Sequence, residues 1–164
     1  MHIIMGIILA AGAIAFAVSR IIQAGDDVRG AARRYKWSRR TNTSPLDGLS
    51  DPREAGAVLV TQVAAYEGDL TEAQAAAIRD GMAERFGVSG DEASGLLGFG
   101  RHAVGQLTDA ANSLSKLVSP IRAACTDEES AGFVQLLQTV AAVEGPVTDE
   151  QQRLIDGVRR GLLN

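Results

Sequence analysis

Two acidic stretches with nearly the same sequence are the places where this chain could do chemistry. Residues 63–74 read VAAYEGDLTEAQ, and residues 140–151 read VAAVEGPVTDEQ. Glu67 and Glu144 occupy the same position in the two copies, and Asp69 adds another carboxylate to the first. The repeat is either a pair of functional acidic loops or two copies of one way to turn a corner between helices.

The corner interpretation accounts for most of the repeated residues. When residues 59–74 are aligned with residues 136–151, eight of sixteen positions are identical. In both copies an apolar helical pattern stops at Glu-Gly, and Gly68 and Gly145 favour the left-handed conformation that ends a helix. A corner needs no carboxylate at the three acidic positions, so these remain candidates for a function.

The same capping-box pattern marks most of the predicted helix starts after residue 50. A side chain that caps a free backbone N–H is followed three residues later by Glu or Gln, whose side chain bonds back to the cap residue. Five sites have this pattern, with caps at Asp51, Thr71, Ser89, Thr126 and Thr148, and Ser119–Pro120 predicts a sixth start. Apolar residues between the starts recur at helical spacing. Residues 51–164 are therefore predicted to form an all-α domain of about six helices around one core.

The first 24 residues predict a transmembrane anchor. No charge interrupts residues 3–19, and an apolar helix that continues to residue 24 is about 33 Å long, enough for a bilayer core of about 30 Å. A cleaved signal peptide is disfavoured, because such peptides carry their basic residues before the apolar stretch. One helix face holds Gly6, Ala10, Ala13 and Ala17, a stripe that either packs against another transmembrane helix or reflects composition alone.

Basic residues follow the apolar stretch. Residues 25–40 are predicted to form a juxtamembrane helix that contacts lipid headgroups, and residues 41–50 a linker. The side chains predicted to lie at the headgroups are Arg20, Arg29, Arg33, Arg34, Tyr35, Lys36, Trp37, Arg39 and Arg40. This charge pattern places the N-terminus outside and the domain in the cytoplasm. Residues 51–164 hold nine Lys or Arg and seventeen Asp or Glu, a net charge of −8, which argues against nucleic acid as a partner of the domain.

The two corners resemble those of the TerB-like tellurite resistance family. The resemblance covers roughly residues 51–163, and it rests on the Glu-Gly helix ends, the Thr starts that follow them, and the stretch FGVSGDEASGLL at residues 86–97. The family implies a helical fold of two related halves and a role in stress response at the bacterial inner membrane. It also implies a divalent metal bound by acidic loop residues, which in this chain would be Glu67, Asp69 and Glu144.

One departure from the family pattern bears on the metal. Where the family closes its motif with glutamate, this chain has Gln74 in the first copy and Gln151 in the second. A hard cation prefers charged oxygens, whereas a capping box needs only the side-chain oxygen that Gln keeps. Membrane-anchored DnaJ-like co-chaperones also combine an anchor with a TerB-like domain, but neither His2 nor His102 begins the His-Pro-Asp motif of their J domains.

No residue set in the sequence predicts catalysis. Cys125 is the one cysteine, and His102 has no second histidine or cysteine at metal-ligand spacing. The glycines at 95, 98, 100 and 105 lie in a helical pattern and predict close helix packing rather than a phosphate-binding loop.

The predicted function is therefore non-enzymatic. The chain is expected to be a membrane-tethered interaction module, an accessory or stabilising subunit of a larger inner-membrane complex. Its expected partners are membrane lipid and other integral membrane proteins, and no cofactor is expected. The sequence is also compatible with a homo-oligomer. The alternative is a divalent-metal-binding sensor in the tellurite or envelope stress response.

Overall fold

The computed structural model describes residues 46–107 and 110–164, apart from the side chains at 67 and 110–112. Every regular element in these ranges is a helix, so the predicted all-α class of about six helices is confirmed. The helices are α3 (Pro52–Ala64), the short 3₁₀ helix η1 (Ala65–Glu67), α4 (Glu72–Phe86), α5 (Gly90–Val104), α6 (Ala110–Ala124), α7 (Asp127–Ala141) and α8 (Asp149–Leu163). The predicted anchor and juxtamembrane helix lie outside the described residues. None of the described helices combines the length and the apolar character needed to cross a membrane.

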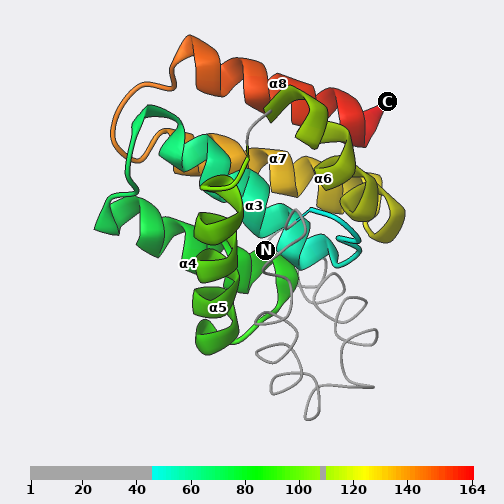
Figure 1. Ribbon diagram of the computed structural model, residues 1–164, viewed down its shortest axis with the longest axis horizontal. Helices are drawn as coiled ribbons and strands as arrows, with labels where there is room; N and C mark the ends of the chain where they lie inside the picture. Colours follow the sequence, from blue (N-terminus) through cyan, green and yellow to red (C-terminus); the bar gives the residue numbers. More distant parts are fainter. Residues whose placement is uncertain (1–45, 108–109) are drawn as a thin grey trace, which may run out of the picture. The chain divides into compact units, whose positions relative to one another are not determined.

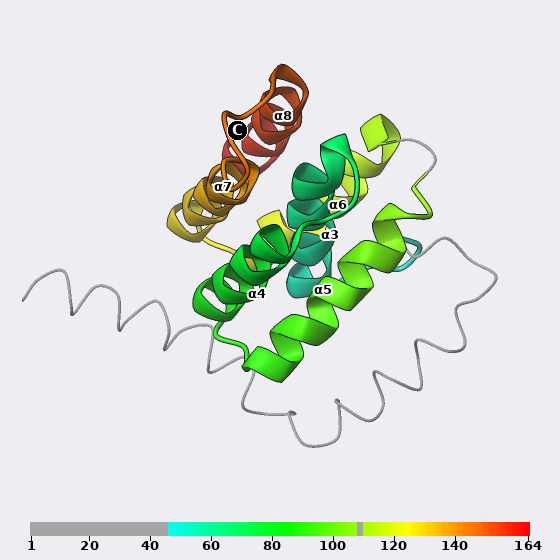
Figure 2. The same cartoon turned by 90° about the vertical axis from the view of Figure 1, so that its left-hand side faces the viewer.

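Helix α3 lies in the middle of the domain. Its residues 55–64 are all buried, without the alternation of buried and exposed positions that a surface helix shows. Figure 1 shows α7 and α8 on one side of α3 and α4 and α5 on the other, and in Figure 2 α5 lies across α3 from α7 and α8. A helix that is buried on all sides has to be surrounded, and the later helices surround this one.

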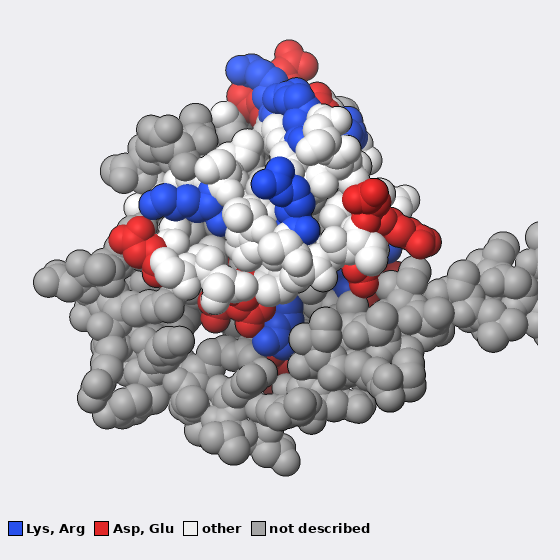
Figure 3. Space-filling model, turned by 90° about the vertical axis from the view of Figure 1, so that its right-hand side faces the viewer, with Lys and Arg blue, Asp and Glu red and all other residues white. Residues whose placement is uncertain are grey.

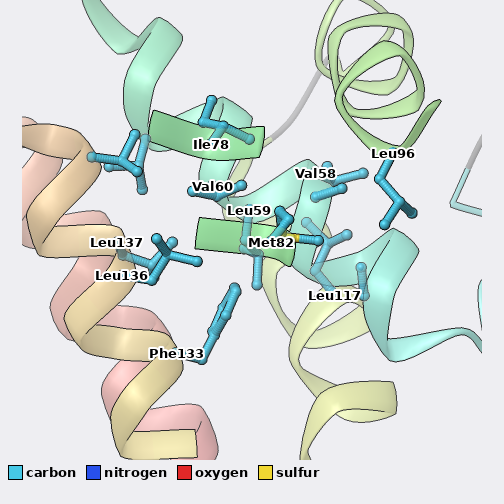
Figure 4. Packing of buried hydrophobic residues seen from close by; sticks show 14 of the residues in the cluster. Val58, Leu59, Val60, Ile78, Met82, Leu96, Leu117, Phe133, Leu136 and Leu137 are labelled. Carbon is cyan, nitrogen blue, oxygen red and sulfur yellow. The ribbon is translucent and has the colours of Figure 1, made fainter. Parts of the chain in front are cut away.

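The core forms where the other helices meet α3. Met82 of α4 and Leu59 of α3 lie together, with Phe133 and Leu136 of α7 on one side and Leu96 of α5 on the other (Figure 4). All five side chains are nearly or fully buried. Burial of each such side chain stabilises the fold by roughly 1.5–3 kcal/mol relative to exposure, which explains how a domain poor in aromatic residues holds together.

The predicted caps are confirmed at five helix starts, and the full reciprocal box forms at three of them, Thr71, Thr126 and Thr148. The side chains of Asp51, Thr71, Ser89, Thr126 and Thr148 each accept a hydrogen bond from a backbone N–H of the helix that follows. The predicted start at Ser119–Pro120 is wrong, because α6 begins at Ala110 and runs through Pro120. Buried Leu117, Val118 and Ile121 keep the helical spacing across the proline, so packing overrides the local signal for a start.

The glycines of α5 differ in what surrounds them. Gly100 is buried, and a Cβ at this position would lie 2.6 Å from the backbone oxygen of Ala57, so α3 and α5 approach closely here. Gly95 and Gly98 are exposed, and a Cβ at either would meet no atom within 4 Å. The close packing predicted for the glycine run therefore holds at Gly100 and is wrong for Gly95 and Gly98.

Candidate functional site

The two repeated corners have similar backbone angles at the helix end and at the glycine, although only the first contains a 3₁₀ helix, η1. The C-cap residue of α3 is Ala65, with φ −85° and ψ 12°, and that of α7 is Ala142, with φ −87° and ψ 1°. Gly68 and Gly145 follow with φ of 145° and 152°, a region that side chains disfavour. The corners therefore require glycine, although each glycine lies beyond the end of the helix and does not form the left-handed stop that the sequence predicted.

Each corner leads into a reciprocal capping box. Thr71 Oγ1 accepts from the backbone N–H of Gln74 at 3.1 Å, and Gln74 Oε1 accepts from the backbone N–H of Thr71 at 3.1 Å. In the second copy, Thr148 Oγ1 accepts from the backbone N–H of Gln151 at 3.3 Å, and Gln151 Oε1 accepts from the backbone N–H of Thr148 at 3.0 Å. The oxygen of each glutamine side chain is thus used to begin a helix, α4 in the first copy and α8 in the second.

The amide nitrogens of the same two glutamines reach one helix end. Gln74 Nε2 donates to the backbone oxygen of Ala64 at 3.1 Å, and Gln151 Nε2 donates to that of Val63 at 3.0 Å. Both acceptors belong to the last turn of α3, where carbonyl groups lack partners within the helix. We call these four residues, Val63, Ala64, Gln74 and Gln151, the corner junction. It joins the end of α3 to the starts of α4 and α8.

Of the three candidate metal ligands, the structure describes the side chains of Asp69 and Glu144. Glu144 is exposed and accepts a hydrogen bond from Thr71 Oγ1, which brings the second corner against the first. Asp69 is exposed, and the side chain of Glu67 lies outside the described part. Among the described residues, no group of three His, Cys, Asp or Glu side chains is placed to hold a metal ion.

The chemistry of the corner junction does not fit a cation. Gln74 and Gln151 are 6% and 4% exposed, so they form its buried interior. Their oxygens already accept from Thr71 and Thr148, and their nitrogens present N–H donors to the carbonyl oxygens of α3. A cation needs oxygens directed toward it, and here the carbonyl oxygens are directed toward amide hydrogens.

Two titratable groups elsewhere in the domain have shifted pKa values. A hydrogen bond from Arg79, together with its positive charge, lowers the pKa of the Glu72 carboxyl in the first turn of α4. Burial raises the pKa of the Cys125 thiol, and the Glu129 carboxylate adds to this shift. A thiol with a raised pKa is a poor nucleophile at neutral pH, so Cys125 is not an activated cysteine.

Comparison with known protein families agrees with this architecture. Residues 53–163, well over half of the chain, match the family described as tellurite resistance protein TerB. The chain belongs to the TerB family. The match begins at the start of α3 and ends at the end of α8, so the TerB domain contains all six described α-helices and both corners. No curated protein and no solved structure matches the chain significantly.

The sequence predicted the residues of both corners, but for Gln74 and Gln151 it predicted only one of the two kinds of hydrogen bond that they make. It predicted Gln74 and Gln151 as capping partners, and it did not predict that their amide nitrogens bond to α3. The contact from Gln151 to Val63 spans 88 residues, so no local pattern reveals it. The available signal was the amide itself, because Gln keeps an N–H donor that Glu lacks.

Proposed function

We propose that this TerB protein is a non-enzymatic, membrane-tethered interaction module. It would serve as an accessory or stabilising subunit of a larger complex in the bacterial inner membrane. The observation that carries the proposal is the order of its parts: an uncharged apolar stretch over residues 3–19, basic residues from Arg20 to Arg40, and then a separately capped helical domain. An apolar anchor with basic residues on its C-terminal side would keep such a domain at the cytoplasmic face.

The way the domain uses its polar groups supports a binding role. The glutamines and threonines of the two corners are engaged in hydrogen bonds that join helices, which suits a rigid scaffold. On one face of the domain, uncharged side chains surround a basic side chain in the middle, and basic and acidic side chains lie together along the top, at the level of α8 in Figure 1 (Figure 3). A largely uncharged surface with charged residues at its margin is common at interfaces, which supports a protein partner for this face.

Membrane tethering is tested first. Cells that express the full chain are lysed and their membranes washed with alkaline carbonate, and fusions of the C-terminus to alkaline phosphatase and to a fluorescent protein report its side. We expect the chain to stay in the washed membranes, with the fluorescent fusion active and the phosphatase fusion silent. Recovery in the soluble fraction, or an active phosphatase, would refute the tethered arrangement.

The partner is tested through the small-residue stripe of the predicted anchor. Transmembrane helices associate by close backbone packing, because lipid on every side removes any hydrophobic drive. Ala10→Leu and Ala13→Leu should therefore reduce the amount of partner protein that co-purifies in mild detergent, whereas Ile7→Leu and Ile8→Leu should not. Equal recovery with all four variants would count against docking through the stripe.

A further inference from the structure

The corner junction has side-chain amides at the two positions where the family motif, which implies a bound metal, closes with glutamate. We propose that in this protein the amides of Gln74 and Gln151 stand in for a divalent cation, so that the junction between the corners is complete without metal. This inference concerns the interior of the domain and does not depend on the proposed membrane tether. Each of the two can therefore fail while the other holds.

The first argument is the polarity of the groups that meet. Backbone oxygens such as those of Val63 and Ala64 are ligands that a hard cation uses. Here each of them accepts an N–H at hydrogen-bonding distance, 3.0 Å from Gln151 Nε2 and 3.1 Å from Gln74 Nε2. An ionised glutamate has acceptors only, so glutamate at these two positions would set a carboxylate oxygen against a carbonyl oxygen in each of the two pairs unless a cation lay between them. Glutamine removes that requirement.

The second argument is the field at the corner junction. The N-termini of α4 and α8 both lead into it, and a helix N-terminus carries about half a positive charge. The two glutamines occupy the third helical position of these helices, where the capping box holds each of them by its oxygen. A buried cation would face these two positive helix ends against the single negative end of α3, and burying a charge is costly. A neutral amide satisfies the α3 carbonyl groups without that cost.

The first experiment asks whether the wild-type protein responds to metal. The full chain in detergent micelles is melted by circular dichroism after treatment with EDTA, and again with millimolar calcium, manganese or zinc. We expect the same melting temperature under all conditions, within about 1 °C. A saturable rise of several degrees with one cation, or a fall after EDTA, would overturn the proposal, because a ligand that binds the folded state raises its stability.

The second experiment replaces one amide by a carboxyl group of the same shape. Gln151→Glu is compared with Gln135→Glu, which adds the same charge at an exposed position of α7. At pH 7 we expect Gln151→Glu to melt about 5 °C or more below the wild type, because a buried carbonyl group loses its donor. Gln135→Glu should melt within about 2 °C of the wild type, as surface substitutions usually do.

The pH dependence separates a missing donor from a mere disturbance of packing. A carboxylate beside Val63 O should have a raised pKa in the folded protein, and once protonated it can donate an O–H in place of the amide. The stability that the protonated carboxyl group gives the Gln151→Glu variant is fully present below the ordinary glutamate pKa of about 4.3, and it is lost as the pH rises through the pKa of this group in the folded protein. The difference in melting temperature between the variant and the wild type should therefore be smaller at pH 4.5 than at pH 7.

The surrounding carboxylates do not obscure this comparison. The carboxylates described on the corners and on the first turns of α4 and α8 are present in both proteins, and they are Asp69, Glu144, Glu72, Asp149 and Glu150. A Gln151→Glu variant that melts like Gln135→Glu at pH 7, or whose deficit is the same at pH 4.5, would overturn the role of the amide.

Discussion

Thr71 is predicted to stabilise the domain more than Thr148, although the two occupy the same position in the repeat. Both hydroxyl groups accept from the third residue of the following helix, at 3.1 Å and 3.3 Å. Thr71 Oγ1 also donates to Glu144 of the other corner. The comparison of Thr71→Ala with Thr148→Ala therefore isolates the contact between the corners from the cap that both share.

The magnitudes follow from the burial of these groups. Loss of an N-cap costs about 1 kcal/mol, and this cost applies to both variants. A hydrogen bond to a charged group adds about 1.5–3 kcal/mol when it is buried, but Thr71 and Glu144 are both exposed, so solvent reduces this term to about 0.5–1 kcal/mol. We expect Thr71→Ala to lower the free energy of unfolding by about 1.5–2 kcal/mol, and Thr148→Ala by about 1 kcal/mol.

The assay is urea unfolding followed by circular dichroism in a double-mutant cycle of Thr71→Ala and Glu144→Ala. The cycle should give a coupling energy of about 0.5–1 kcal/mol, and the same cycle built on Thr148 and Glu144 should give none. Coupling that is absent in the first cycle, or equal in both, would refute the claim that Glu144 joins the second corner to the first.

Three further predictions concern the packing and chemistry of the rest of the domain. Gly98→Ala should raise the free energy of unfolding by about 0.5–1 kcal/mol, because alanine has the higher helix propensity and the added Cβ meets no other atom. Gly100→Ala should lower it by about 1–2 kcal/mol, because the backbone of α3 obstructs a Cβ at this position. Equal effects of the two substitutions in urea titrations would contradict this difference. Arg53→Ala should lower the free energy of unfolding by about 2 kcal/mol, since this largely buried side chain bonds to two carboxylates, whereas Arg79→Ala, whose partner is fully exposed, should have a clearly smaller effect in the same assay. Cys125 should react with iodoacetamide at pH 8 several-fold more slowly than in urea-unfolded protein, because its raised pKa reduces the thiolate fraction; equal rates would contradict the shift.

The sequence predicted the elements that depend on local chemistry. The caps at Asp51, Thr71 and Thr148 were readable because the interacting groups lie within three residues of one another. Family membership was readable for the same reason, since the corner motif is short and occurs twice. The burial of α3 on all sides was not predicted, because residues 55–64 include the polar Thr61 and Gln62, which are buried in the structure.

The features that depend on tertiary packing could not be predicted from the sequence. The Ser119–Pro120 pair has the local form of a helix start, and only the burial of Leu117 and Ile121 shows why α6 continues through it. Gly95 and Gly98 look like packing glycines, but their direction on α5 depends on where α3 lies, and they face outward. The bond from Gln151 to Val63 likewise needs the second hairpin to lie against the first.

The repeat is best explained as one joint made by two corners rather than as two sites. The bonds cross between the copies: Gln151 of the second corner donates to α3 of the first hairpin, and Thr71 of the first corner donates to Glu144 of the second. Each Thr–Gln pair has to begin a helix and present an amide to the same end of α3, so both copies face the same chemical demand. A corner that lost its glutamine would leave a carbonyl of α3 without its amide donor at a cost of about 1–3 kcal/mol. The two similar sequences therefore supply the two amide donors that the end of α3 accepts.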